Sequence, residues 1–115
     1  MQIAGSAGTI LFDSQGYTLY TFTKDTRNRD DCASLAGCLY VWPALVSGKP
    51  TEGPGVKRRL VGTIAVRGVG RQVTYAGHPL YSYVGDSRPA ETDNINIFQS
   101  QGYWPAIAPW GRAVK

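Results

Sequence analysis

Apolar and polar residues alternate with a period of two near the start of the chain. In residues 17–22, YTLYTF, this alternation places Tyr20 and Phe22 on the same face of an extended strand. The residues DSQG at 13–16 are typical of a turn, and the run GTILF at 8–12 precedes them. The pattern therefore predicts a β-hairpin over residues 8–22.

The second half of the chain has a similar pattern. The runs LVGTIAV at 60–66 and QVTY at 72–75 predict two strands around the turn RGVGR, and a tight turn at 76–77 leads to HPLYSYV. Both halves continue into a polar loop, residues 23–31 and 85–102, and then into Trp-Pro-Ala-Leu or Trp-Pro-Ala-Ile. Proline removes a backbone donor, so we expect an edge or a corner there. The Gly/Pro-rich residues 46–59 join the two halves.

A ten-residue phrase occurs twice. GYTLYTFTKD at 16–25 and GHPLYSYVGD at 77–86 both read Gly-x-x-Leu-Tyr-x-aromatic-x-x-Asp, with an offset of 61 positions, and Trp42 and Trp104 are 62 positions apart. Motifs in the same order at nearly the same offset indicate an internal repeat. We predict an all-β fold of two homologous antiparallel β units packed about a pseudo-two-fold axis. Residues 1–115 then form one domain, with repeats at about 8–46 and 60–111, long polar loops and at most one short helical turn.

The composition agrees with this fold and argues against some classes of protein. The 115 residues include 14 Gly and 7 Pro, which fits strands joined by many turns. The net charge is +4, but the basic cluster at residues 57–59 has no aromatic residue near it, so we expect no nucleic-acid partner. No run of apolar residues is long enough for a membrane helix. The N-terminal residues lack the features of a signal peptide and a lipid-attachment cysteine, so either the protein is cytosolic or a targeting segment has been removed.

The two cysteines bear on this choice. Cys32 and Cys38 lie in CASLAGC, which predicts one helical turn with Asp30 or Asp31 as N-cap and Gly37 near its C-terminus. A chain that folds back at Gly37 allows a disulfide, which implies an oxidising compartment. Free structural thiols and a metal or redox role are the alternatives, although the spacing is not that of a Cys-x-x-Cys motif.

These residues together resemble a known family. The motif Tyr-x-aromatic-x-x-Asp is followed in the first copy by the two cysteines and Trp-Pro, and the second copy lies in RQVTYAGHPLYSYVGD. The chain therefore resembles the secreted repeat family of predicted lipoproteins that carries this motif, over residues 8–111. The resemblance implies export to a bacterial or archaeal cell envelope, through a signal peptide or a lipid anchor, and no established biochemical activity. Five residues separate the cysteines here, where the family usually has three.

The repeated phrase is either a binding site or part of the framework. Aromatic residues on one strand face usually pack a core, but an exposed strip of them stacks on sugars. An aspartate at the end of a strand caps a turn, and the two acidic loops also offer oxygen ligands for calcium through Asp25 and Asp86. The candidate binding residues are Tyr20, Phe22, Asp25, Tyr81, Tyr83, Asp86, Trp42 and Trp104.

No residue pattern points to catalysis. The chain has one histidine, His78, and no Gly-x-Ser-x-Gly elbow, and its acids lie in polar loops. We therefore predict a non-catalytic extracytoplasmic module for binding or assembly, without a cofactor, whose partner is an envelope protein, a polymer or another copy of itself. It would meet a membrane only through a lipid anchor that is not in this chain. The alternatives are sugar or cell-wall-polymer binding through exposed aromatics, and an accessory role in envelope metal or redox handling.

Overall fold

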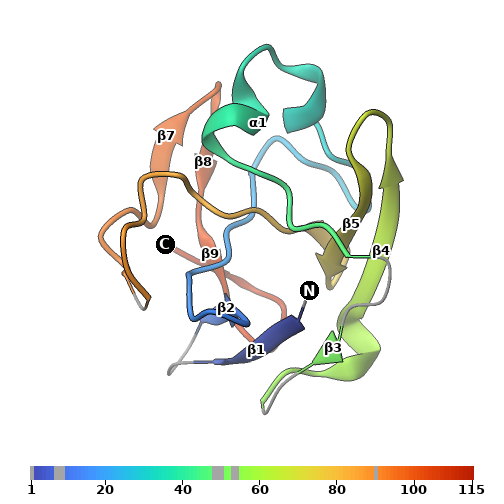
Figure 1. Cartoon of the computed structure of the whole chain (residues 1–115), viewed down its shortest axis with the longest axis vertical. Coiled ribbons are helices and arrows are strands. Elements are labelled where there is room, and N and C mark those ends of the chain that lie inside the picture. The colour runs from blue at the N-terminus through green and yellow to red at the C-terminus, as the bar shows by residue number, and fades with distance from the viewer. Residues whose placement is uncertain (1, 7–9, 48–50, 53–54, 90) are drawn as a thin grey trace.

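The computed structural model describes residues 2–6, 10–47, 51–52, 55–89 and 91–115. It consists mainly of short strands in antiparallel sheets, and the chain extends over 35 × 29 × 22 Å (Figure 1). The all-β fold is thus confirmed. Helical structure is limited to α1 (Cys38–Val41) and the 3₁₀ turns η1 (Cys32–Ser34) and η2 (Arg58–Leu60) among the described residues. Two 3₁₀ turns accompany the single helix, where one helical turn was expected.

Four small sheets make up the described strands. The first has β1 (Gln2–Ser6) between β2 (Leu11–Asp13) and β3 (Thr51–Glu52), antiparallel to β2 and parallel to β3. The second is the meander β4 (Val61–Val66), β5 (Gly70–Tyr75) and β6 (His78–Pro79). The remaining two are the pairs β7 (Ile97–Gln99) with β8 (Gly102–Trp104), and β9 (Ala106–Ile107) with β10 (Ala113–Val114).

Both predicted hairpins are present. The first is short: Phe12 bridges Thr18, and the amide of Leu19 donates to the carbonyl of Leu11 at 3.2 Å. The second is the long β4–β5 ladder, followed by a two-residue turn in which Gly77 has φ +81°, a value that glycine adopts without strain. Residues 8–9, at the start of the predicted first run, lie outside the described residues.

Several strands differ from the sequence prediction. Strand β1 was not predicted, β3 lies inside the connector 46–59, and β7 lies inside residues 85–102, which the composition indicated to be a polar loop. The reason at β7 is that only Ile95, Ile97 and Phe98 are large apolar residues in that segment, and Phe98 is exposed. An edge hairpin that buries few side chains carries a weak periodic signal.

The interior has two adjoining clusters of buried side chains. The aliphatic cluster joins both repeats and comprises Leu11, Leu19, Leu45, Val73, Tyr75, Leu80 and Ile107. The aromatic cluster comprises Tyr20, Phe22, Cys32, Cys38, Trp42, Tyr81 and Trp104. Because the leucines of the repeated phrase lie in the first cluster and its aromatic residues in the second, the phrase forms the boundary between them.

The two repeats are joined by reciprocal backbone hydrogen bonds. The amide of Thr21 donates to Pro105 at 2.8 Å, and the amide of Ser82 donates to Pro43 at 2.9 Å. Each copy of the phrase therefore pairs with the Trp-Pro segment of the other repeat. Tyr20 lies opposite Tyr81 at the centre. These reciprocal contacts define the pseudo-two-fold arrangement of the two units.

Candidate functional site

The motif aromatics form a continuous stack at the junction of the repeats. Phe22 stacks on Trp104 with ring centroids 4.0 Å apart, Trp104 on Trp42 at 4.2 Å, and Trp42 on Tyr83 at 4.2 Å. Along this stack, rings from the first and second repeats alternate. Stacked and edge-to-face aromatic pairs each stabilise by about 0.5–1.5 kcal/mol beyond the area they bury. The stack therefore joins the two repeats.

One residue from β7 satisfies both indole N–H groups of the stack. The indole Nε1 of Trp42 donates to the side-chain oxygen of Gln99 at 2.9 Å, and Nε1 of Trp104 donates to the backbone oxygen of Gln99 at 3.0 Å. A buried indole N–H without an acceptor costs free energy of desolvation, and the two hydrogen bonds to Gln99 offset this cost for both tryptophans. No sequence pattern indicated this role, because Gln99 lies in the segment predicted as a loop.

The tyrosines and aspartates of the two motifs pair across the repeats. The hydroxyl of Tyr81 donates to Oδ2 of Asp25 at 2.6 Å, and the hydroxyl of Tyr20 donates to Oδ2 of Asp86 at 2.8 Å. Each tyrosine thus bonds the aspartate of the other copy, not the one five positions further along its own. Hydrogen bonds to a carboxylate are about twice as strong as those between neutral groups. The motif is therefore a reciprocal connection between the units.

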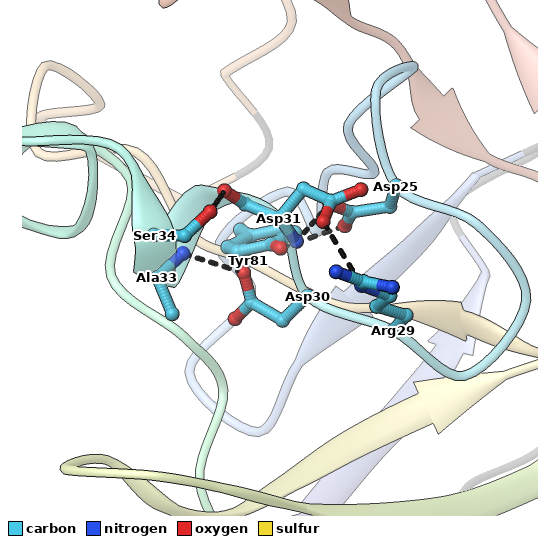
Figure 2. Close-up of polar contacts among 7 residues, drawn as sticks. All are labelled: Asp25, Arg29, Asp30, Asp31, Ala33, Ser34 and Tyr81. Atoms are coloured by element: carbon cyan, nitrogen blue, oxygen red, sulfur yellow. Dashed lines mark hydrogen bonds and ion pairs between the residues drawn. The ribbon is translucent and has the colours of Figure 1, made fainter.

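Two further carboxylates, those of Asp30 and Asp31, lie near Asp25 (Figure 2). Its Oδ1 accepts the backbone N–H of Asp31 at 2.8 Å, while Asp30 accepts the N–H of Ala33 at 2.8 Å. Burial raises the pKa of Asp25 to about 7, and the nearby Asp30 and Asp31 carboxylates add to the rise; the hydrogen bonds from Tyr81 and Asp31 partly oppose it. Asp25 therefore titrates near neutral pH in the folded protein.

Asp86 has different neighbours. Its Oδ1 accepts the side-chain amide of Asn94 at 2.8 Å, and the same amide reaches Glu91 at 3.2 Å. The backbone N–H of Ser87, which donates to Glu91 at 2.9 Å, is the main cause of a lowered pKa at Glu91. Backbone N–H groups thus bond carboxylates in both acidic loops, and in the second loop the side chain of Asn94 also joins Asp86 to Glu91.

The two tyrosine hydroxyls stay protonated at any physiological pH. Burial raises the pKa of Tyr20, and its hydrogen bond to Asp86 raises it further. Burial likewise raises the pKa of Tyr81, with a further contribution from the charge of Asp25. A tyrosine whose pKa is raised in this way donates a hydrogen bond and does not act as a base.

Cys32 and Cys38 form a disulfide, as one of the sequence alternatives predicted. The S–S distance is 2.02 Å and the Cα atoms are 5.4 Å apart. Gly37, with φ +77°, turns the chain between η1 and α1, and both sulfurs lie in the aromatic cluster. Gly37 is thus at the N-terminus of α1, whereas the sequence placed it at the end of the helical turn. The bridge packs against the motif aromatics.

Asp25 and Asp86 do not share a ligand set. Each accepts a hydroxyl from a different tyrosine, and in the described part of the chain no three His, Cys, Asp or Glu side chains are grouped as a metal site would require. Asp25 also holds a backbone N–H, so the predicted turn-capping role is present there. Calcium binding stays a prediction.

Most motif aromatics lie inward, but Tyr83 is partly exposed and lines a pocket of about 270 Å³ together with Asp86. Tyr20, Tyr81, Trp42 and Trp104 are fully buried, whereas Trp110 is 55% exposed. Further exposed large apolar residues are Tyr40, Val46, Val84, Phe98 and Tyr103. Any stacking of a sugar would therefore involve Tyr83 or surface rings outside the motif.

A known family matches both halves of the chain. The family described as a secreted repeat of unknown function matches residues 1–46 and again residues 63–108. The chain belongs to this family, and its secreted character supports an extracytoplasmic location. No curated protein and no solved structure matches the chain. Among the helices that the structure describes, none has the length and apolar character needed to cross a membrane.

Proposed function

We propose that the chain is a non-catalytic module of the cell surface or envelope that binds a partner protein through the surface of a rigid two-repeat scaffold. One observation carries this proposal: the motif residues of both copies are used inside the fold, in the aromatic stack and the Tyr–Asp pairs. Residues that hold a scaffold together are needed in both halves, while a catalytic set is needed once. The repetition therefore fits a framework.

The interior also argues against a redox role for the cysteines. Cys32 and Cys38 are bridged and fully or almost fully buried. Exchange with another thiol requires attack on an accessible sulfur. We therefore assign the disulfide to stabilisation of the first repeat and place partner binding on exposed residues.

A test uses isolated cell envelopes and the purified chain. We expect the chain to co-sediment with intact envelopes and to lose this binding after the envelopes are treated with protease and washed. Absence of binding to the untreated envelopes contradicts the proposal. Turnover of a hydrolase substrate, abolished by a single surface substitution in a folded variant, also contradicts it.

A second candidate function is binding of a cell-wall polymer. Phe98 and Tyr103, paired across β7 and β8, are 63% and 47% exposed, with ring centroids 4.9 Å apart and planes at 67°. Tyr103 also lines a pocket of about 200 Å³ with Thr23, Asn96 and Lys115. An aromatic face beside hydroxyl, amide and ammonium groups suits a polyol.

The same envelope experiment separates the two candidates. Polymer binding survives protease treatment and is lost in the variant Phe98→Ala/Tyr103→Ala. The matched control is Tyr40→Ala, which removes a ring that is 87% exposed elsewhere on the surface and leaves polymer binding unchanged. Loss of binding in both variants contradicts a specific site on the β7–β8 hairpin.

A further inference from the structure

Strand β4 is the edge of its sheet. The strand order is β4–β5–β6, and Figure 1 shows β4 at the outside of the molecule, beyond β5. Its six residues pair in register with β5 from Val61 opposite Tyr75 to Val66 opposite Gly70. An edge of this length with which no further described strand pairs presents backbone donors and acceptors that another extended segment can use.

The neighbouring hydrogen bonds show which backbone groups of β4 face outward. The amide of Val73 donates to Leu45 at 2.7 Å, and the carbonyl of Arg71 accepts from Ser47 at 2.9 Å, so these β5 residues point away from β4. Gln72 and Thr74, which alternate with them, therefore bond to their β4 partners. By the same alternation Val61, Thr63 and Ala65 direct their N–H and C=O groups to the free edge. No backbone hydrogen bond joins these three residues to a described residue outside the hairpin.

A pocket lies beside the C-terminal half of this strand. It has a volume of about 410 Å³. It is lined by residues 64–67, by Asn28, Arg29 and Asp30 of the preceding loop, and by Ala33 and Ser34. A segment paired with β4 would place alternate side chains on the two faces of the sheet. The pocket is large enough to receive one of them.

Two arginine side chains, Arg67 and Arg71, lie at this edge, and Asp30 on the pocket wall is the nearby acidic residue. Arg71, on β5, donates from Nη2 to Oγ1 of Thr63 on β4 at 2.7 Å. Ala65, opposite Arg71 in the register, is small and exposed, so it leaves the guanidinium accessible. Arg67 follows β4 directly, and neither arginine makes an ion pair with a described residue.

This charge disfavours a second copy of the chain as the occupant. Antiparallel pairing of two β4 strands about Thr63 would bring Arg67, which follows β4 in one copy, toward Arg59 in η2 of the other, at both ends of the pair. Parallel pairing in register would place Arg67 beside Arg67. Like charges directly opposite each other destabilise a strand pair.

We propose that the free edge of β4 binds an extended acidic peptide segment of a partner protein, which adds to the sheet as a further strand. The backbone of Val61, Thr63 and Ala65 supplies the hydrogen bonds, and the guanidinium groups of Arg67 and Arg71 receive carboxylates of the guest. This inference rests on the binding role proposed above and names the chemistry of the partner.

The test measures binding of a labelled Val-Glu repeat octapeptide to the full chain by fluorescence anisotropy. We expect saturable binding, with amide shifts in the NMR spectrum at Val61, Thr63 and Ala65, and no binding of the Val-Lys repeat. Ala65→Pro removes one outward N–H that the hairpin does not use, and Arg71→Glu reverses one charge; each is expected to weaken binding about tenfold or more. Arg112→Glu, with the same change in net charge on an exposed residue directly before β10, is the control and leaves affinity within about twofold.

Circular dichroism establishes that each variant is folded, and Arg71→Glu decides the outcome if Ala65→Pro does not fold. The proposal is overturned if the acidic peptide does not bind, or if Arg112→Glu weakens binding as much as Arg71→Glu, which is the behaviour of general charge attraction. Self-association through β4, detected by sedimentation, also overturns it. Envelope binding that is protease-sensitive but unchanged in Arg71→Glu and Ala65→Pro overturns this inference alone and leaves the proposed function intact.

Discussion

Tyr20 and Tyr81 lie opposite each other on the pseudo-two-fold axis, and their backbones exchange two hydrogen bonds, of 2.8 Å from the amide of Tyr20 and 2.9 Å from the amide of Tyr81. Their side chains then diverge, and each hydroxyl reaches the aspartate of the opposite motif copy. One residue type at one motif position thus connects the repeats through both its backbone and its side chain. This makes the two halves structurally dependent on each other.

The Tyr81–Asp25 pair is expected to be measurable in stability. Tyr81→Phe removes a hydrogen bond to a carboxylate, and we expect the free energy of unfolding to fall by about 1.5–3 kcal/mol in urea titrations. Tyr40→Phe, at a highly exposed ring, is the control and should change it by less than about 0.5 kcal/mol.

A double-mutant cycle tests whether the pairing crosses the repeats. Tyr81→Phe combined with Asp25→Asn should show a coupling energy of about 0.5 kcal/mol or more, since these two residues are in contact. The same tyrosine variant combined with Asp86→Asn should be additive. Coupling to Asp86 and not to Asp25 would mean that each motif is closed within its own copy.

The central tryptophans are expected to contribute equally. Trp42→Ala and Trp104→Ala each open a large cavity in the stack, and we expect a loss of about 3–5 kcal/mol with a weakened near-UV circular dichroism signal. Trp110→Ala, at a half-exposed ring, should cost much less. A large loss at Trp42 and a negligible one at Trp104 would contradict a stack shared by both repeats.

Asp25 should make stability depend on pH in an unusual direction for a carboxylate. Its pKa is about 7 in the folded chain and near 3.8 when unfolded, so the folded state holds this proton more tightly. The stabilisation from protonated Asp25 is complete below pH 3.8 and is lost as the pH rises through about 7. We expect the urea midpoint of the wild type to fall relative to that of Asp25→Asn as the pH rises from 4 to 8. A constant difference over this range would show that Asp25 ionises normally.

Neither repeat should fold alone. Because each motif segment pairs with the Trp-Pro segment of the other repeat, separated fragments of residues 1–47 and 55–115 lack the strands and rings that complete their cores. We expect both fragments to be unfolded by circular dichroism and to regain structure when mixed. A cooperative thermal transition in either isolated fragment would show that the units are independent domains.

Several features were predictable because they depend on local pattern. The alternation around Tyr20 and Phe22 placed both rings on one face, and both are buried. The β4–β5 hairpin followed from two β-branched runs around a glycine turn. Cys32 and Cys38 were close enough in the chain to be bridged once Gly37 reversed its direction.

Other features depended on distant contacts and left little local signal. The role of Gln99 comes from two indole N–H groups that reach it from other segments, one of them 57 positions away. The free edge of β4 is defined by what does not pair with it. Such relationships do not alter the composition or the period of a segment.

The sequence by itself determined that the chain contains two copies of one β unit, with a shared aromatic and acidic motif and a nearly constant spacing. It did not determine which tyrosine binds which aspartate, because Tyr20 and Tyr81 occur in equivalent patterns and each has an aspartate five positions further on. Only the packing of the two halves decided this. The direction of the paired strands carries each hydroxyl across the axis, and in this packing the indole N–H groups of Trp42 and Trp104 and both tyrosine hydroxyls find an acceptor.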